Sequence, residues 1–281
     1  MKKILSLISV IFIILSFISC DDSDDESGSS PDAGGEKSTE NKYPLYYQGA
    51  KRQDLPLYFL NGVNDLPYIE VDECVGLLKN LYQFIDKPIE LKVSKSGSIV
   101  TLVRQNETYG VNIPVTIDFE KDTIRFQDYD MFTMLPSRST ILDVTSFDFF
   151  DKENTPRLIQ KVEPKYLPRL GEPLELNLGS YGIDLPIRDG KYLIPLQTFS
   201  DVFFVPVFLN NIYFNGKSVI IASDLSEKGD QKSRELYYQG EQGERSAELA
   251  KFGYGELCLM LDNLYGLKDK KEISSFDKLF Q

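Results

Sequence analysis

Serine, lysine, tyrosine and carboxylate side chains are the groups with which this chain of 281 residues could carry out catalysis, because it contains no histidine. The absence of histidine excludes a Ser-His-Asp triad, a Cys-His pair and any histidine-ligated metal site. A serine nucleophile with a lysine base remains, and it requires a lysine of lowered pKa beside the serine together with an oxyanion hole. Ser275 and Lys278 form the one S-x-x-K pair of the sequence.

The surroundings of the serine–lysine neighbours favour structural roles. The pair of Ser275 and Lys278 lies close to the last residue, Gln281, so we expect no following chain to build a pocket around it. We interpret the pair as part of a surface helix that Ser275 or the serine before it caps. The other neighbours are predicted turn residues, namely Ser94 with Lys95 and Ser226 with Lys228. The sequence therefore predicts no catalytic residue.

Two pairs of carboxylates raise metal binding and acid-base chemistry as alternatives. Asp128 and Asp130 flank Tyr129, but the glycine and the distal glutamate of a calcium loop are missing, so we predict a solvated turn rather than a cation site. Asp118 and Glu120 share one face of a predicted strand, where we predict a polar hairpin face rather than an acid-base pair. The sequence has no Gly-rich or Walker-type phosphate loop. We therefore expect neither a metal nor another cofactor.

The composition indicates an acidic folded body. The sequence has 43 acidic and 31 basic side chains and a formal net charge of -12. This charge argues against nucleic acid as a partner, because phosphate binding needs clustered Lys and Arg. With 42% hydrophobic residues, the chain can bury a core of one or two domains. The 16 Tyr and 18 Phe residues are expected mostly in that core, and a fraction could line a groove for a peptide or a glycan.

The N-terminus has the features of an export signal. Two lysines precede an apolar run over residues 4–18, which is too short for a membrane span and fits a secretory signal peptide over residues 1–19. The run ends at Ser19 and Cys20 and resembles the signal of bacterial lipoproteins, in which the cysteine is lipidated after cleavage. Phe17 stands where the usual pattern has Leu, so the match is to the relaxed form of that signal. An ordinary signal peptide with a chance cysteine at its end is the alternative.

Lipidation of Cys20 would attach the chain to the inner or the outer membrane of the cell envelope, facing the periplasm or the exterior. Two acyl chains suffice for stable attachment, because each buried methylene contributes about 0.8 kcal/mol. Residues 20–42 are rich in Asp, Ser, Gly and Glu, and we predict that they form a disordered tether. For Cys74 and Cys258 we favour two buried free thiols, with a disulfide as the alternative.

The remaining sequence predicts an α+β fold of two small strand-helix-hairpin units followed by a C-terminal helical segment. The units cover residues 43–135 and 171–223, with a connector over residues 136–170 between them. A polar linker over residues 224–245 leads to the helical segment, residues 246–281. The strongest hairpin signals are Ser96-Gly97, residues 120–122 and Asn215-Gly216.

Apolar residues at helical spacing define the predicted helices. One stripe occurs in both units, formed by Val71, Cys74, Leu77 and Leu78 in the first and by Leu196, Phe199, Val202 and Phe203 in the second. The stripe of the last segment consists of Ala250, Tyr254, Leu257, Cys258, Leu261, Leu264 and Tyr265. The shared stripe predicts that the two units are copies of one structural repeat.

Two stretches carry a resemblance to known families. The stretch DGKYLIPLQTFSDVF resembles the repeat of stalk or copper amine oxidase N-terminal-like domains, which implies a spacing element and, in a chain without histidine, no copper. The stretch FGYGELCLMLDNLYGLKDKKEISSFDKLF resembles the segment just before the catalytic domain in C-terminal processing (tail-specific) serine peptidases. The resemblance to these peptidases covers residues 55–281, and it implies a non-catalytic N-terminal region, because nothing in the chain matches the family's catalytic Ser and Lys.

Three functions follow as expectations, in descending order of preference. The first is a cell-envelope lipoprotein that is the non-catalytic part of a tail-specific peptidase relative, either truncated or working with a separate catalytic domain. The second is a free-standing adaptor that binds a peptide, a protein or a wall polymer. The third is an enzyme with an unrecognised Ser, Tyr or carboxylate site.

Overall fold

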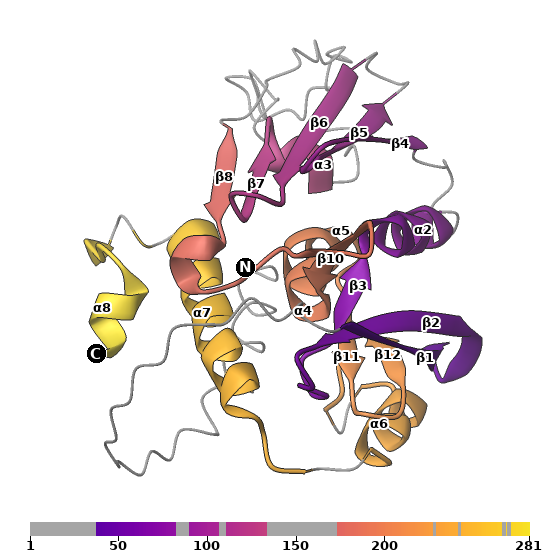
Figure 1. Cartoon of the computed structure of the whole chain (residues 1–281). Helices are drawn as coiled ribbons and strands as arrows, with labels where there is room; N and C mark the ends of the chain where they lie inside the picture. Colours follow the sequence, from indigo (N-terminus) through magenta and orange to yellow (C-terminus); the bar gives the residue numbers. More distant parts are fainter. Residues whose placement is uncertain are drawn as a thin grey trace, which may run out of the picture. The chain divides into compact units, whose positions relative to one another are not determined.

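A computed structural model describes the chain over residues 38–82, 90–106, 111–133, 173–226, 229–240, 243–265, 268 and 271–281. These residues combine helices with two β-sheets, so the α+β class is confirmed (Figure 1). The predicted signal peptide, Cys20, the connector over residues 136–170 and Lys228 lie outside the described residues. Within the described residues, no helix combines the length and the apolar character that a membrane span requires.

The larger sheet contains seven strands in the described part of the chain. Their order across the sheet is β11 (Asn211–Phe214), β12 (Val219–Ala222), β1 (Ser38–Tyr47), β2 (Ala50–Leu60), β3 (Tyr68–Glu70), β10 (Lys191–Pro195) and β9 (Ile187–Arg188). Strands β1 and β12 run parallel, and every other neighbouring pair is antiparallel. Residues 38–42, which the sequence assigned to the disordered tether, form the first half of β1 and pair with β2. Their paired backbone groups hold these polar residues in place although none of them is buried.

The smaller sheet is an antiparallel meander. Its described strands are β4 (Glu90–Ser96), β5 (Ile99–Asn106), β6 (Val111–Asp118), β7 (Thr123–Phe126) and β8 (Leu174–Asn177), in this order. The three predicted hairpin turns are confirmed, since Gly97, Asp122 and Gly216 each have positive φ between paired strands. At the third turn the Asn215 side chain accepts hydrogen bonds from the backbone N–H groups of the two residues after Gly216, which fixes the turn.

Helices and short helical turns connect the strands. They are α2 (Val71–Tyr82), α3 (Tyr129–Thr133), the 3-10 turn η3 (Gly179–Tyr181), α4 (Leu196–Phe199), the π-helical turn η4 (Ser200–Phe204), α5 (Val205–Phe208), α6 (Gln231–Tyr238), α7 (Ala247–Leu264) and α8 (Phe276–Phe280). Helix α6 lies in the segment that the sequence assigned to a polar linker. Its N-terminus is capped by the Asp230 carboxylate, which accepts from the N–H groups of Lys232 and Ser233. This cap and the contacts of α6 with β12 hold the helix where its polar composition gave no signal.

The predicted repeat has a counterpart in the larger sheet. Strand β3 leads into α2, and strand β10 leads into α4. The two strands pair antiparallel with Ile69 opposite Ile194, and each of these residues lies two positions before the first residue of its helix. The two strand–helix junctions therefore occupy equivalent positions on an antiparallel pair of strands. All eight residues of the repeated stripe are at most 3% exposed.

The two sequence segments share their sheets and their core. Strand β12 of the second segment pairs with β1, β10 pairs with β3, and β8 extends the smaller sheet beside β7. One cluster of buried apolar side chains includes residues from both segments. Its aromatic members Phe126, Phe132 and Phe203 have ring centroids 5.4 to 6.2 Å apart. The expectation of a largely aromatic core holds for the described phenylalanines, most of which are buried, whereas Tyr58 and Tyr68 are the buried tyrosines of the described residues. The strand–helix units are thus halves of one body, because neither could complete a sheet alone.

Candidate functional site

A polar pocket of about 450 Å³ lies between α7, η3 and the start of α8. Its lining includes the side chains of Tyr181, Lys251, Tyr254, Cys258, Asp262, Lys268 and Ser275. A pocket with several converging polar groups is the default place to look for a binding function.

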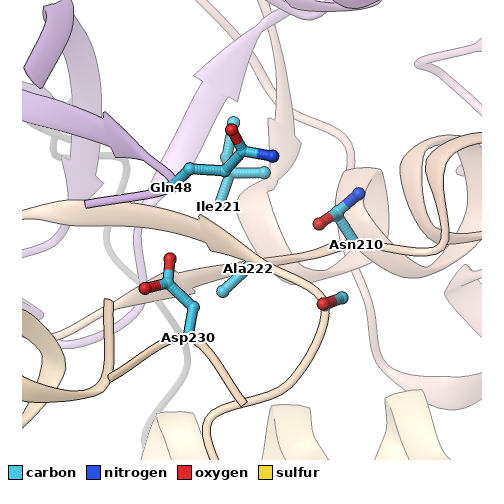
Figure 2. A pocket seen from close by; sticks show the side chains of 6 residues that line it. Gln48, Asn210, Ile221, Ala222 and Asp230 are labelled. Carbon is cyan, nitrogen blue, oxygen red and sulfur yellow. The ribbon is translucent and has the colours of Figure 1, made fainter. Parts of the chain in front are cut away.

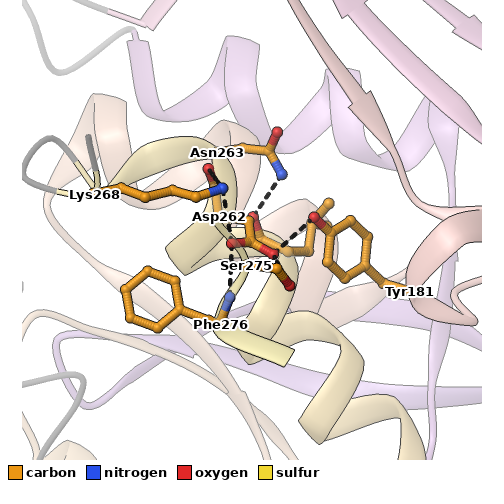
Figure 3. Close-up of polar contacts among 7 residues, drawn as sticks. Tyr181, Asp262, Asn263, Lys268, Ser275 and Phe276 are labelled. Atoms are coloured by element: carbon orange, nitrogen blue, oxygen red, sulfur yellow. Dashed lines mark hydrogen bonds and ion pairs between the residues drawn. The ribbon is translucent and has the colours of Figure 1, made fainter. Parts of the chain in front are cut away.

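The carboxylate of Asp262, which lines this pocket, is the centre of a cluster of polar contacts (Figure 3). It accepts a hydrogen bond from the Tyr181 hydroxyl at 3.1 Å and from the backbone N–H of Phe276 at 2.9 Å. Lys268 Nζ forms an ion pair with it at 2.9 Å, and the Ser275 hydroxyl donates to it at 3.4 Å. We call this cluster the Asp262 hub. Burial by itself would raise the pKa of Asp262, but the bonds from Lys268, Phe276 and Tyr181 outweigh it and lower the pKa below its ordinary value.

The hub attaches α8 to α7. Ser275 occupies the position before α8, as the sequence predicted, but its side chain makes no capping bond. The backbone N–H at the start of α8 is satisfied by Asp262 of the neighbouring helix. Helix ends leave such N–H groups without intrahelical partners, so a carboxylate from α7 takes the place of a local cap. Lys278 is exposed on α8, so the S-x-x-K spacing places its lysine on the surface while the hydroxyl of Ser275 faces a carboxylate.

Gly255 explains why α7 lies so close to η3. A Cβ atom at this position would be 2.2 Å from the backbone oxygen of Tyr181, so only glycine fits. The contact also sets which face of α7 is buried. Phe252, Gly255, Glu256, Cys258 and Leu259 face inward, whereas Ala250 and Tyr254 of the predicted stripe are exposed. The predicted stripe was therefore wrong for the first half of α7, because close backbone packing at a glycine outweighed the pattern of large apolar residues.

Two further groups in the pocket have raised pKa values. The Tyr254 hydroxyl donates to Asp277 Oδ1 at 2.8 Å, and this bond raises the pKa of Tyr254. Burial raises the pKa of the Cys258 thiol, and burial also raises that of Cys74 well above its ordinary value. Both cysteines are free and buried, as the sequence favoured. A thiol held in its protonated form is a poor nucleophile, so Cys258 acts as a small apolar side chain.

The carboxylate pairs predicted from the sequence lie away from this pocket. Asp128 is buried and accepts a hydrogen bond from the Met131 N–H at 2.9 Å, so the solvated turn predicted there is wrong: Asp128 caps α3, while Asp130 is exposed. Asp118 accepts hydrogen bonds from the N–H groups of Glu120 and Lys121 in the β6–β7 turn. The polar hairpin face predicted for Asp118 and Glu120 is confirmed, because the Asp118 carboxylate accepts hydrogen bonds from backbone N–H groups of the turn.

The other serine–lysine neighbours also have structural partners. Ser94 and Lys95 belong to strand β4 rather than to a turn, because β4 continues to Ser96 and the turn begins at Gly97. Lys95 Nζ pairs with Asp72 at 2.8 Å. Ser226 lies in a turn as predicted, where its N–H and its hydroxyl both bond to Asp224.

A second, smaller concavity of about 210 Å³ lies near the β1–β2 turn (Figure 2). Its polar side chains belong to Gln48, Asn210, Ser223 and Asp230. The Asp230 carboxylate caps α6, and the Asn210 amide donates to the backbone oxygen of Phe208 at 2.7 Å. Because this concavity is less than half the volume of the pocket of the Asp262 hub, it is the weaker candidate.

The sequence interpretation missed two acidic residues of α7, Asp262 and Glu256. Both carboxyl groups have defined partners, since Asp262 forms the hub and Glu256 accepts a bond from the Thr198 hydroxyl at 2.7 Å. The predicted stripe placed them on the polar face of the helix. The sequence does contain an indication of their burial, because each is the one charged residue in an otherwise apolar stretch of α7.

Replacing Asp262 by Ala is expected to lower the free energy of unfolding by about 2 kcal/mol. The change removes the partner of Lys268 and leaves the N–H of Phe276 unbonded, and hydrogen bonds to charged groups contribute on the order of 1.5–3 kcal/mol. Asp262→Asn keeps an acceptor and should fall between wild type and Ala. Urea denaturation measures the loss, with Glu248→Ala on the exposed first turn of α7 as the control. An Asp262→Ala midpoint equal to that of wild type would contradict the central role of the hub.

Comparison with known proteins adds no relative to these observations. No family model, no curated protein and no solved structure matches the chain. The resemblances to stalk-type repeats and to tail-specific peptidases therefore rest on the residues of the chain itself, and the site is interpreted from its geometry.

Proposed function

We propose that the chain is a lipid-anchored protein of the bacterial cell envelope whose folded body is a non-catalytic module related to the N-terminal region of tail-specific serine peptidases. The observation that carries the proposal is the Asp262 hub. Ser275 and Lys268 are the serine and the lysine of the pocket that bind Asp262, and the bond of Ser275, which directly precedes α8, helps to hold α8 on α7. A Lys held in an ion pair is not poised as a base, because a base must be able to accept a proton from the serine.

The rigid attachment of α8 suits a module that holds another protein domain. Leu279 and Phe280 on α8 are 59% and 46% exposed, while Phe276 at its start is buried. Neighbouring exposed apolar side chains mark surfaces that contact another protein. In the peptidase relative that we propose, this partner is a separate catalytic domain.

A free-standing adaptor is the second candidate, and the pocket favours it. The pocket of about 450 Å³ has the size of small-ligand sites and presents hydroxyl and amino groups next to the exposed ring of Tyr254. Such a pocket suits a peptide segment or a wall polymer. Nucleic acid stays disfavoured because of the net charge of -12.

The full chain, extracted from membranes of an expressing bacterium, is expected not to react with a fluorophosphonate serine probe and to cleave no C-terminal peptide above background. The physical reason is that the Ser275 hydroxyl donates to a carboxylate, which holds its proton without removing it. Gel fluorescence after labelling measures the reaction, and a known serine hydrolase in the same extract is the positive control. Labelling of the chain that disappears in Ser275→Ala would overturn the non-catalytic proposal.

A further inference from the structure

Glu256 is a buried carboxyl group in the middle of α7. Its residue is 4% exposed. Oε2 accepts a hydrogen bond from the Thr198 hydroxyl at 2.7 Å, and Thr198 lies on α4. Among the residues that the structure describes, Oε1 is buried and has no hydrogen-bond partner. Because the threonine donates to Oε2, Oε1 is the oxygen that is free to carry a proton.

A second carboxylate, Asp201 on η4, adds to the effect of burial on Glu256. Burial raises the pKa of Glu256, and the negative charge of Asp201 raises it further, to about 8. Burial also raises the pKa of Asp201. Asp201 is the more exposed of the two, and the Gln197 amide donates to both of its oxygens at 2.8 Å. These bonds favour the charged form of Asp201, so Glu256 is the group that holds the proton.

The neighbouring titratable groups offer Glu256 no positive charge. The titratable groups near Asp201, the acidic neighbour of Glu256, are Tyr129 and Tyr213. The Tyr129 hydroxyl donates to the Val202 backbone oxygen, and Tyr213 lies on β11. On the η3 side is Tyr181, whose hydroxyl bonds to Asp262. Within the described residues, the groups that shift the pKa of Glu256 are Asp201 and Thr198, and neither is basic. An ionised Glu256 would therefore be a buried charge without compensation, which is strongly unfavourable.

Glu256 lies between the two sets of contacts that hold the ends of α7, so its protonation state affects how the whole helix packs. At the N-terminus of α7, the backbone N–H and the hydroxyl of Ser246 both bond to Asp65 at 2.7 Å. At the C-terminal end, Asp262 bonds to Tyr181 and carries α8. Glu256 lies between these attachments, and Gly255 beside it lines the pocket. Asp201 lies in the π-helical turn η4, which follows α4. Such turns are rare in proteins as a whole, but many of those that occur lie at functional sites.

We propose that Glu256 is a proton-controlled latch: in its neutral form it keeps α7 seated on α4 and η4, and loss of its proton to solvent releases α7 together with the Asp262 hub. The latch does not depend on the proposed function, because it concerns how α7 is held and not what the pocket binds. Its direction follows from linkage. The unfolded or released state loses the proton near the ordinary value of 4.5, whereas the seated state keeps it to a higher pH. The seated state is thus favoured at low pH and weakened as pH rises.

The test compares the full wild-type chain with Glu256→Gln, which mimics the neutral side chain, and with Glu248→Gln on the exposed first turn of the same helix. Hydrogen exchange of the α7 amides, corrected for the intrinsic effect of pH and referred to the amides of β5, reports the opening of α7. In wild type and in Glu248→Gln, the opening constant should rise with pH by up to about tenfold per unit between pH 5 and the raised pKa. In Glu256→Gln this rise should be lost. A pH dependence in Glu256→Gln equal to that of wild type overturns the latch.

Two further measurements keep the proposal testable if Glu256→Gln does not fold. The carboxyl carbon of Glu256 in the wild-type chain, followed by NMR, should titrate more than two pH units above an exposed glutamate such as Glu248. A midpoint within one unit of that of Glu248 overturns the latch. Calcium added at pH 8 should leave the opening of α7 in wild type unchanged. A calcium-dependent closing would show that Glu256 and Asp201 hold a cation, which also overturns the proton assignment.

Discussion

Phe199→Asp is expected to unfold the entire described body and not the second strand–helix unit alone. Phe199 is 1% exposed, and its ring lies about 6 Å from the rings of Phe203 and Phe204. Removing a buried Phe costs about 3–5 kcal/mol, and burying an unpaired carboxylate adds to this. The sum approaches the total stability of a domain, which is on the order of 5–15 kcal/mol.

Because the two segments share one core, we expect Phe199→Asp to lose the folded structure of both segments together. Residues of both segments belong to one apolar cluster, so loss of the second unit removes partners of the first. A thermal melt followed by circular dichroism should therefore show one transition for wild type and no folded baseline for the variant. Phe280→Asp is the matched control, because Phe280 is 46% exposed and its replacement should change the melting temperature little. Two separated transitions in wild type, or an unchanged melt for Phe199→Asp, would contradict the single core.

Cys20→Ala is expected to abolish the labelling of the chain by radioactive palmitate and to release it from the membrane fraction. The reason is that Ser19 and Cys20 follow the apolar run, and a lipoprotein needs the thiol of that cysteine for its acyl anchor. Without two acyl chains, the stabilisation of about 0.8 kcal/mol per buried methylene is lost. Labelled cells are separated into membrane and soluble fractions and the chain is precipitated from each.

Cys74→Ala is the control for this labelling experiment. Cys74 is a buried free thiol in α2, so its removal should leave the label unchanged. Palmitate that persists on Cys20→Ala would contradict the lipoprotein proposal, and a wild-type chain without any label would favour the alternative of an ordinary signal peptide.

Local structure was largely predictable from the sequence. The hairpins at Gly97 and Gly216 follow from residues that tolerate positive φ, and the repeated helix stripe follows from its apolar spacing. These signals are short-range, because turn geometry and helix periodicity depend on residues a few positions apart. The two strand–helix units were recognisable for the same reason.

Long-range pairing was not predictable, and the candidate site depends on it. Nothing in β1 indicates that it pairs with β12, and α6 is held by a cap and a contact that its polar composition does not reveal. The burial of Glu256 follows from the fit of Gly255 against Tyr181, which is a property of two backbones and not of a pattern in one helix. The S-x-x-K pair drew attention to Ser275, but the group that organises the pocket is Asp262, on another helix.

The parallel pairing of β1 with β12 has a consequence for the order in which the chain can fold. When a chain emerges N-terminus first, β1 precedes the other described strands, and it can form its hairpin with β2 at once. The other edge of β1 pairs with β12 (Val219–Ala222), and Leu45 lies opposite Val219. This pairing can form only after residues 219–222 have emerged. Until then a strand that ends up in the interior of the sheet has an open edge, and such edges recruit other chains. The emergence of residues 219–222, and not formation of the first hairpin, should therefore set the time at which the open edge of β1 is covered and the risk of aggregation falls.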